Sequence, residues 1–375
     1  MRDDSLSQLS ILNSQLICCG GLRTDYIITA QGKVRVMEMG GNALYAAAGA
    51  QIWLRPIAIL ARIGDGYPLG WLDDLCAYGF DTRGIRKVPG FQDHRTFYAY
   101  LDENTRVDTE PARHFARLGF ELPAALRDYV HSTPGQDDPH HYEPLAVTPE
   151  DLEAYFAART EAKDAPRPIP PSPGPDRLWQ AGERGSVIGL HIAPSSICTQ
   201  RHLPQVARRY GVQVIGADPG ERAMQPALMP YVEEVLAQVD VFMPSDQEAE
   251  SLFRDEPDEM DPRRCAEWFA ARGPRVVVLK LGSDGALVHE RDSSRFWHVP
   301  ALPVRVVDVT GAGDAFCGGF MADFVRHGDP VRAAITGTVS ASLAIQDYGP
   351  LHILDATEDE VDHRASLLRS FVTAF

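Results

Sequence analysis

The sequence predicts an α/β protein in which a mostly parallel central sheet carries helices on both faces and a small β lid covers one end of it. Apolar segments of strand length alternate with segments of helical apolar spacing along much of the 375 residues, and this alternation predicts the central sheet. Two further segments with strand character break the alternation. They predict the lid.

Each strand expected in the central sheet is nearly all apolar, as strands buried on both faces of a parallel sheet are. In the first half of the chain we expect strands at 16–19 and 56–60 and helices at 43–54 and 71–78. The second half repeats the pattern more clearly, with strands at 187–191, 212–217, 239–243 and 276–281 and helices at 200–209, 229–237 and 263–272. Short connections between these segments favour a parallel sheet with helices on both faces.

The lid is assigned to residues 25–39 and 95–102. The first segment alternates apolar and polar residues around the turn at 31–33, which is typical of a half-exposed hairpin. The second is rich in Tyr and Phe and is followed by turn residues. Together they would cover the ends of the large sheet, where a lid can exclude water from a reaction. An ordinary surface hairpin is the alternative.

Residues 103–185 are expected to form an insertion. Thr148, Pro149 and two acidic residues are typical of a helix start, and six prolines between 166 and 175 indicate an extended linker. We therefore assign 1–24, 40–94 and 186–375 to the α/β core, and 103–185 to a helical insertion that ends in this linker.

The most informative motif is the segment DVTGAGDAF at 308–316. We expect an apolar strand at 304–307 before it and a helix after it, so the loop would end at a helix N-terminus. There the amides of Gly311, Ala312 and Gly313 would lack intrahelical partners, and the helix dipole favours an anion such as a phosphoryl group. Asp314 beside this anion site is typical of a catalytic base. An acid that only complements the dipole is the alternative.

Composition and charge exclude several classes of partner. A net charge of −16 and a pI near 5.2 argue against nucleic acid and against a membrane surface, because both are bound by basic faces. No stretch approaches the roughly 18 apolar residues that span a bilayer. The six cysteines have no paired spacing and indicate reduced thiols in a cytoplasmic protein.

Residues 310–320 are similar, almost residue for residue, to the C-terminal signature of the PfkB-type carbohydrate kinases of the ribokinase-like superfamily. The resemblance extends over most of the chain outside the insertion. It implies a ribokinase-like three-layer sandwich, and an ATP-dependent phosphotransferase that moves the γ-phosphoryl group to a hydroxyl of a small sugar or sugar-like acceptor. It also implies Asp314 as the base, the amides of 311–313 as the anion hole, and ATP and Mg²⁺ as cofactors.

Other matches imply a substrate site. Asp25 resembles the family's aspartate that binds substrate hydroxyls, and Gly40 and Gly41 resemble its glycine pair at the substrate. Asn42 is a candidate contact if the loop is rearranged. Arg23 stands where members often carry asparagine, so we consider it a candidate for recognising an anionic or strongly polar acceptor.

A second group of matches implies the nucleotide and metal sites. Residues 281–285 resemble the family's nucleotide loop, and Glu248 resembles a glutamate that organises Mg²⁺ through water. Asp308 falls where some members help to hold a monovalent cation, K⁺ in our assignment. The nucleotide-binding residues assigned on this basis are Lys280, Gly282, Ser283, Gly285 and Thr310.

Three positions depart from the family pattern. Tyr45 stands at a substrate-binding asparagine, Arg23 at another asparagine, and Ser245 at the asparagine of the motif that contains Glu248. These departures argue against ribose as the acceptor. They leave open a nucleoside kinase, with Tyr45, Phe97 and Tyr98 stacking on a base.

A non-catalytic ligand-binding protein of the same fold also stays open, as does a homodimer through paired lids, which the insertion could block. The absence of a Gly-x-Gly-x-x-Gly turn at an early strand argues against a dinucleotide-dependent oxidoreductase, and the absence of a Walker sequence argues against P-loop chemistry.

Overall fold

The computed structural model of the protein describes residues 14–102, 105–130, 137–161, 187–255 and 261–375. Its centre is a sheet with the strand order β14-β13-β12-β11-β10-β9-β8-β1-β4-β5. Neighbours from β11 to β5 pair in parallel, whereas β12, β13 and β14 add an antiparallel edge. The strands are β1 Leu16–Cys19, β4 Ile57–Ile63, β5 Ile85–Lys87, β8 Gly189–Ile192, β9 Val214–Ala217, β10 Val241–Phe242, β11 Val276–Lys280, β12 Ala286–Glu290, β13 Arg295–Val299 and β14 Thr373–Ala374.

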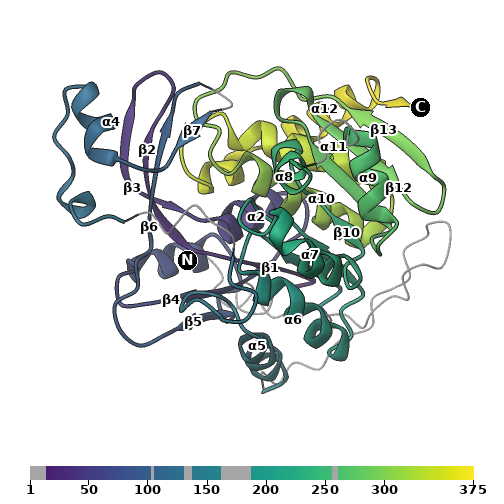
Figure 1. Cartoon of the computed structure of the whole chain (residues 1–375), viewed down its shortest axis with the longest axis horizontal. Helices are drawn as coiled ribbons and strands as arrows, with labels where there is room; N and C mark the ends of the chain where they lie inside the picture. Colours follow the sequence, from purple (N-terminus) through teal and green to yellow (C-terminus); the bar gives the residue numbers. More distant parts are fainter. Residues whose placement is uncertain (1–13, 103–104, 131–136, 162–186, 256–260) are drawn as a thin grey trace.

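Helices cover both faces of this sheet, so the fold has three layers (Figure 1). One apolar cluster joins the sheet to α2 Asn42–Gln51, α3 Gly70–Ala77, α10 Ala312–His327, α11 Pro330–Ala344 and α12 Glu358–Arg369. A second cluster joins the other face to α5 Pro149–Glu161, α6 Ile197–Arg209, α7 Met229–Leu236, α8 Asp246–Leu252 and α9 Pro262–Ala270. The short helices η2 Pro226–Leu228 and η5 Leu351–Asp355 lie in the connections. The predicted α/β architecture is confirmed.

A second, four-stranded sheet has the order β3-β2-β6-β7. Its strands are β2 Arg23–Ile28, β3 Val34–Gly40, β6 Arg95–Tyr100 and β7 Arg106–Val107. Both segments assigned to the lid contribute to it, and the sheet also takes in Arg23, Thr24 and Gly40. Figure 1 shows this small sheet at one end of the molecule, with α4 Pro111–Arg117 on its outer side.

The outer face of the small sheet is apolar and covered. Tyr26 and Ile28 on β2 and Phe97 on β6 form a cluster with Phe115 of α4 and Leu126 of η1 Ala124–Leu126. Side chains alternate between the two faces of a strand, so the intervening residues point to the opposite, inner face. The inner face is the one that faces the large sheet.

Two predictions about single elements had different outcomes. Helix α5 begins at Pro149 as predicted, and the Asp151 carboxylate accepts a hydrogen bond from the Thr148 N–H at 2.9 Å. The strand predicted at 304–307 is wrong, because no strand lies between Val299 and α10 in this described stretch. Instead the Val307 N–H donates to the carbonyl of Ile345 after α11. The proline-rich linker lies outside the described residues.

The parallel strands place several loops at one edge of the large sheet. Gly20 follows β1, Asp218 follows β9, Ser245 lies after β10 and Gly282 lies after β11. Because these strands run in the same direction, their carboxyl ends share this edge, which is where open α/β sheets bind ligands.

Candidate active site

The N-terminus of α10 holds the glycine-rich loop. Gly311 precedes the helix with a φ of 74°, in the left-handed region that favours glycine. A Cβ at this position would also lie 2.2 Å from the ring of Tyr45. Only glycine fits there, and the sharp turn places Asp314 in the first turn of the helix, as predicted.

The open amides of this helix end differ by one residue from the prediction. The N–H of Ala312 donates to the carbonyl of Val309 at 3.2 Å, so its assignment to the anion hole is wrong for this structure. Among the described residues, the N–H groups of Gly311, Gly313 and Asp314 have no hydrogen-bond acceptor. These three amides form the end of the helix that can bind an anion.

Two carboxyl groups near this end have no hydrogen-bond donor. Asp25 on β2 is only 2% exposed, Asp314 is half-buried, and neither accepts a hydrogen bond from another described residue. Burial raises the pKa of Asp25 to about 7. The positive charge of Arg23 acts to lower this pKa, and the negative charge of Asp314 acts to raise it. Burial also raises the pKa of Asp314 to about 7, which Asp218 supports and Lys280 opposes. Unpaired carboxyls with such raised pKa values are typical of functional sites.

Gly40 and Gly41 bring the backbone close to Asp25. A Cβ on Gly40 would lie 1.8 Å from Oδ2 of Asp25. Gly41 has a φ of 104°, and a Cβ on it would lie 2.4 Å from the carbonyl oxygen of Gly21. The glycine pair therefore shapes the wall beside Asp25, where the sequence had placed it.

Asn42 joins two loops at the carboxyl edge of the sheet. Its Oδ1 accepts a hydrogen bond from the N–H of Gly21 at 2.8 Å, and its Nδ2 donates to the carbonyl of Pro194 at 2.5 Å. The loops after β1 and β8 are thereby held together. One amide hydrogen of Asn42 remains for a ligand.

Lys280 forms the centre of a charged cluster beside the open amides. It makes an ion pair with Asp218, and its Nζ lies 3.8 Å from Sγ of Cys317. A Cβ on Gly313 would lie 3.6 Å from Nζ, so the ammonium group lies against the end of α10. The sequence analysis missed Asp218. Its position directly after a buried strand was a signal that could have found it.

Glu248 and Asp218 supply carboxylate oxygens to the same cluster. Burial raises the pKa of Glu248 to about 7, which Asp218 supports and Lys280 opposes. Glu248 and Ser245 form a capping box at the start of α8: Oγ of Ser245 accepts from the Glu248 N–H at 3.1 Å, and the Glu248 carboxylate accepts from the Ser245 N–H at 2.6 Å. Serine can therefore replace the family's asparagine without loss of the helix start.

The donor set of this cluster fits a water-bridged Mg²⁺. Oδ1 of Asp218 is buried without a partner, and Mg²⁺ is usually held by one or two carboxylates together with waters and substrate phosphates. The described residues contain no group of three or more His, Cys, Asp or Glu that could form an all-protein cage. Asp218 and Glu248 would therefore hold the ion only in part.

The predicted nucleotide loop lies at the same edge. Gly282, Ser283 and Asp284 form the short helix η4 and are exposed. Gly285 has a φ of 92°, and a Cβ on it would lie 2.1 Å from the carbonyl oxygen of Val299. The loop is thus a tight, accessible turn directly after Lys280.

Thr310 connects the loop to the small sheet. Its hydroxyl donates to Oδ1 of Asp308 at 2.7 Å and lies 2.8 Å from the hydroxyl of Tyr100 on β6. The Thr310 side chain is therefore already engaged by two protein groups. Its assignment to nucleotide binding stays a prediction.

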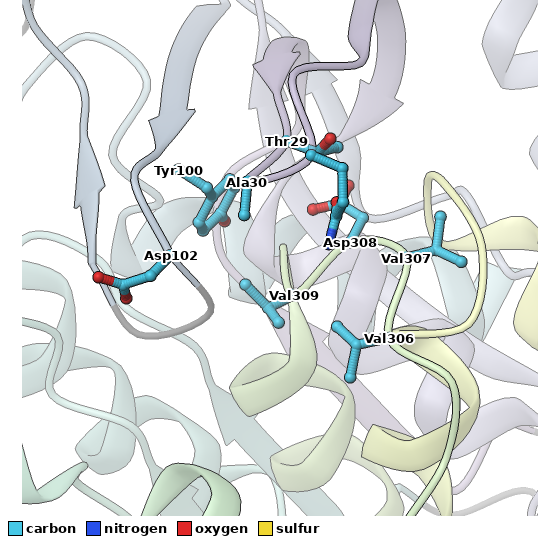
Figure 2. Close-up of a pocket in the computed structure, with 9 residues that line it drawn as sticks. Thr29, Ala30, Tyr100, Asp102, Val306, Val307, Asp308 and Val309 are labelled. Atoms are coloured by element: carbon cyan, nitrogen blue, oxygen red, sulfur yellow. The ribbon is translucent and has the colours of Figure 1, made fainter.

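Asp308 borders a small pocket with residues 29–31 and 306–309 (Figure 2). The volume is about 10 Å³, close to the smallest cavity that holds one water. Oδ2 of Asp308 is buried without a partner. Valine and alanine side chains form much of the pocket's lining, so the assignment of a monovalent cation to Asp308 stays a prediction.

The three aromatic residues considered for base stacking do not share a site. Phe97 packs on the outer face of the small sheet with Phe115, so its assignment to a base-binding site is wrong. Tyr45 is buried against Gly311. Tyr98 lies on the inner face and is half-buried. The side of the strand on which each aromatic falls was the information that the sequence analysis lacked.

Part of the chain is similar to a known protein family. Residues 192–356 match the sequence profile of the pfkB family carbohydrate kinases. The match covers less than half of the 375 residues, and it shows that this segment is similar to that family. The matched segment contains Asp218, Glu248, Lys280 and the glycine-rich loop.

Two curated relatives match different lengths of the chain. A cytidine kinase of Thermococcus kodakarensis is 23% identical over 85% of this chain and 91% of its own length. An uncharacterized sugar kinase of Archaeoglobus fulgidus is 34% identical over 32% of this chain. The chain spans about half the length of that sugar kinase, 48%.

Solved structures confirm the fold. A proposed ribokinase II from E. coli in complex with ATP and Mg²⁺ superposes with a TM-score of 0.63 at 20% identity, over 94% of this chain and 99% of the other. A Burkholderia thailandensis nucleoside kinase in complex with inosine gives a TM-score of 0.62 at 19% identity, over 94% of this chain and 97% of the other.

In the described part of the chain, no helix is both long and apolar enough to cross a membrane.

Proposed function

We propose that the protein is an ATP-dependent phosphotransferase that moves the γ-phosphoryl group to a hydroxyl of a small sugar or sugar-like acceptor. One observation carries this proposal: the unpaired Asp314 carboxyl lies in the first turn of α10, beside the unpaired amides of Gly311 and Gly313. An anion site with an adjacent base is the minimum that phosphoryl transfer to an alcohol needs.

The residues have distinct roles in this reaction. Asp25, which accepts no hydrogen bond from the described protein, binds acceptor hydroxyls and fixes the orientation of the sugar. Asp314 accepts the proton of the attacking hydroxyl as its oxygen forms a bond to the γ-phosphorus. The bond between that phosphorus and the bridging oxygen of ADP breaks, and the amides of Gly311 and Gly313 stabilise the charge on the transferred group.

ATP and Mg²⁺ belong to this proposal. Lys280 lies near Gly313 and would add a positive charge beside the transferred phosphoryl group, and residues 282–285 would hold the nucleotide. Mg²⁺ would neutralise phosphate charge, with Asp218 and Glu248 holding its waters. Asp308, which borders the pocket of Figure 2, would be one of several ligands of K⁺.

A nucleoside acceptor is the second candidate. It is supported by the near full-length match to a cytidine kinase, and by Tyr98 on the inner face of the small sheet, where an aromatic ring can contact a base. Asp25 and Asp314 would serve the ribose of a nucleoside in the same way as a free sugar.

A coupled assay of ADP release tests the proposal. The purified protein is supplied with Mg²⁺ and ATP over a panel of neutral sugars, sugar phosphates, sugar acids and nucleosides, and each product is identified by mass. Phosphorylation of a panel member by the wild type, with the Asp314→Asn variant as the blank, is the expected result. Nucleotide binding without transfer to any acceptor would overturn the proposal and favour the non-catalytic alternative.

A further inference from the structure

A buried tyrosine hydroxyl near Asp25 has no hydrogen-bond partner. Tyr67 lies in the loop between β4 and α3, and the residue is only 2% exposed. Its hydroxyl oxygen is enclosed, and among the described residues it neither donates nor accepts a hydrogen bond. Buried polar groups are paired in nearly all native structures, so an unpaired one calls for an explanation. The sequence analysis gave Tyr67 no role.

The ring of Tyr67 is held in one orientation. Its centre lies 5.5 Å from that of the Trp71 ring at an angle of 82°, and 5.2 Å from that of the His94 ring at 66°. Both are edge-to-face contacts, which aromatic rings prefer. The N–H of Tyr67 also donates to the carbonyl of Gly64 at 3.2 Å. The packed ring therefore keeps its hydroxyl in one direction.

His94 joins the loop of Tyr67 to the start of β2. Its Nε2 accepts a hydrogen bond from the N–H of Gly64 at 2.9 Å, so Nδ1 carries the proton and donates to the carbonyl of Leu22 at 3.0 Å. Burial lowers the pKa of His94, which keeps the ring neutral and preserves this pattern. The loop is thereby held beside the first residues of β2, which include Asp25.

Tyr67 and Asp25 lie on the same side of the small sheet. Thr96 pairs with Asp25, and His94 is two residues before Thr96, so the His94 side chain is on the inner face together with Asp25. Tyr67 belongs to the apolar cluster of the large sheet and packs on the His94 ring. Burial raises the pKa of the Tyr67 hydroxyl, and the nearby charge of Asp25 raises it further. Two buried groups without partners thus lie near each other at the candidate acceptor site.

Arg23 does not pair with the Asp25 carboxylate. Its side chain lies over Gly21, because a Cβ on Gly21 would lie 3.3 Å from Nε, and its Nη1 donates to the carbonyl of Asp93 at 3.4 Å. Among the described residues, no hydrogen bond joins Arg23 to Asp25. Asp25 therefore remains open to a ligand, and the assignment of Arg23 to the recognition of a polar acceptor stays a prediction.

We propose that Tyr67 binds the acceptor, and that its hydroxyl donates to the same acceptor hydroxyl that donates to Asp25. The inference rests on the proposed phosphotransferase. A sugar hydroxyl has one proton to donate and lone pairs that accept, so it fits between an ionised carboxylate, which only accepts, and a phenol, which can donate. A hydrogen atom in its place would leave both protein groups unpaired, and sites of this kind reject analogues that lack the hydroxyl. Tyr67 therefore selects for a hydroxyl at one fixed position of the acceptor.

Removing one oxygen from the acceptor and one from the protein tests the proposal. The best acceptor of the panel is compared with its monodeoxy analogues, such as ribose with 2-deoxyribose or cytidine with 2′-deoxycytidine and 3′-deoxycytidine. We expect the wild type to disfavour one analogue roughly tenfold or more in kcat/KM. In Tyr67→Phe this ratio should fall roughly fivefold or more for that analogue alone. The change should come from the KM of the acceptor, while the KM of ATP stays the same.

The matched control is Tyr155→Phe, because the hydroxyl of Tyr155 is also buried but donates to Asp81 at 2.9 Å. This control should leave the acceptor ratio unchanged and lower the Tm of the free protein. Tyr67→Phe should not lower the Tm of the free protein, since it removes a hydroxyl that the described protein leaves unpaired. The Tm comparison does not depend on activity.

Each outcome has one meaning. An acceptor ratio that is equal in the wild type and in Tyr67→Phe for every analogue overturns the role of Tyr67 and leaves the phosphotransferase intact. A loss of Tm in Tyr67→Phe as large as that in Tyr155→Phe also overturns it, because the hydroxyl then bonds within the protein. Failure to phosphorylate any acceptor of the wider panel overturns the phosphotransferase and this inference with it.

Discussion

Buried or half-buried aspartates have different surroundings in two regions of the protein. Near α5, the fully buried carboxylate of Asp81 accepts hydrogen bonds from Arg83 at 2.7 Å, from Tyr155 at 2.9 Å and from Ser14 at 3.3 Å. In the candidate active site, Asp25 and Asp314 have no hydrogen-bond donor among the described residues. The first arrangement fixes the insertion helix to the core, and the second leaves the carboxyls ready for a ligand.

Asp151 repeats the first arrangement. Its carboxylate is bonded to Arg62 at 2.6 Å and to Arg86 at 3.3 Å while it also caps α5. Complete pairing lets a buried charge persist in a structural role, whereas an unpaired buried charge costs stability. The difference between the regions therefore predicts which substitutions affect folding and which affect catalysis.

The largest effect is expected for Asp81→Asn. The variant leaves the Arg83 guanidinium without its carboxylate, so we expect a loss of roughly 3 kcal/mol in the free energy of unfolding. Denaturant unfolding measures it, and turnover of the folded fraction should be unchanged. An equal stability of variant and wild type would show that the pairing near α5 does not hold the insertion.

Asp314→Asn should reduce turnover and leave the fold intact. Loss of a general base typically costs about 10²–10⁴-fold in rate, so we expect kcat to fall at least about 10²-fold with folding intact. Circular dichroism and single-turnover kinetics make the comparison. Activity within threefold of the wild type would remove Asp314 as the base.

Lys280→Met should reduce kcat by about tenfold or more, because the ammonium lies beside the open amide of Gly313. The Michaelis constant of the acceptor should change much less, since Lys280 would contact the nucleotide in the proposed reaction. Lys280→Arg is the matched control and should recover part of the loss. If the Met variant turns over as fast as the wild type, Lys280 serves only as a partner of Asp218.

The smallest of these expected effects is the change of kcat/KM with pH. Burial raises the pKa of Asp314 to about 7, and only the ionised form can accept a proton, so kcat/KM should rise with pH up to about 7 and then level off. A flat profile between pH 5 and pH 8 would contradict this pKa.

The same shift has a consequence for stability. An aspartate in the unfolded chain has a pKa of about 3.9, so the folded state keeps the proton between pH of about 4 and 7. The stability that Asp314 contributes is therefore present below pH of about 4 and is lost as the pH rises to about 7. Asp314→Asn should raise the Tm at pH 8 relative to the wild type and give no such gain at pH 4.

The sequence predicted the layers of the fold and the turn of the glycine-rich loop before α10, because both depend on local patterns. Apolar runs define buried strands, and the glycines of 311–313 define a turn before a helix. The sequence could not show that Ala312 closes that turn with Val309, because this depends on the backbone angles at Gly311.

Contacts between residues far apart in the chain could not be predicted from the sequence either. Arg106 lies on a strand of two residues whose facing is set only by its pairing with β6. Asn42 hydrogen-bonds to both Gly21 and Pro194, and the second bond depends on a residue that lies 152 positions further along the chain. Such contacts are set by tertiary packing, and no periodicity in the sequence reports them.

The hydrogen bond between the hydroxyls of Tyr100 and Thr310 has a consequence for the hydrolysis of ATP in the proposed reaction. If the small sheet swings away, this bond breaks and the threonine next to Gly311 loses one of its two restraints. The amides proposed to bind the γ-phosphate would then be well ordered only when the small sheet is closed over an acceptor. Futile hydrolysis of ATP by solvent would be suppressed whenever no acceptor is present.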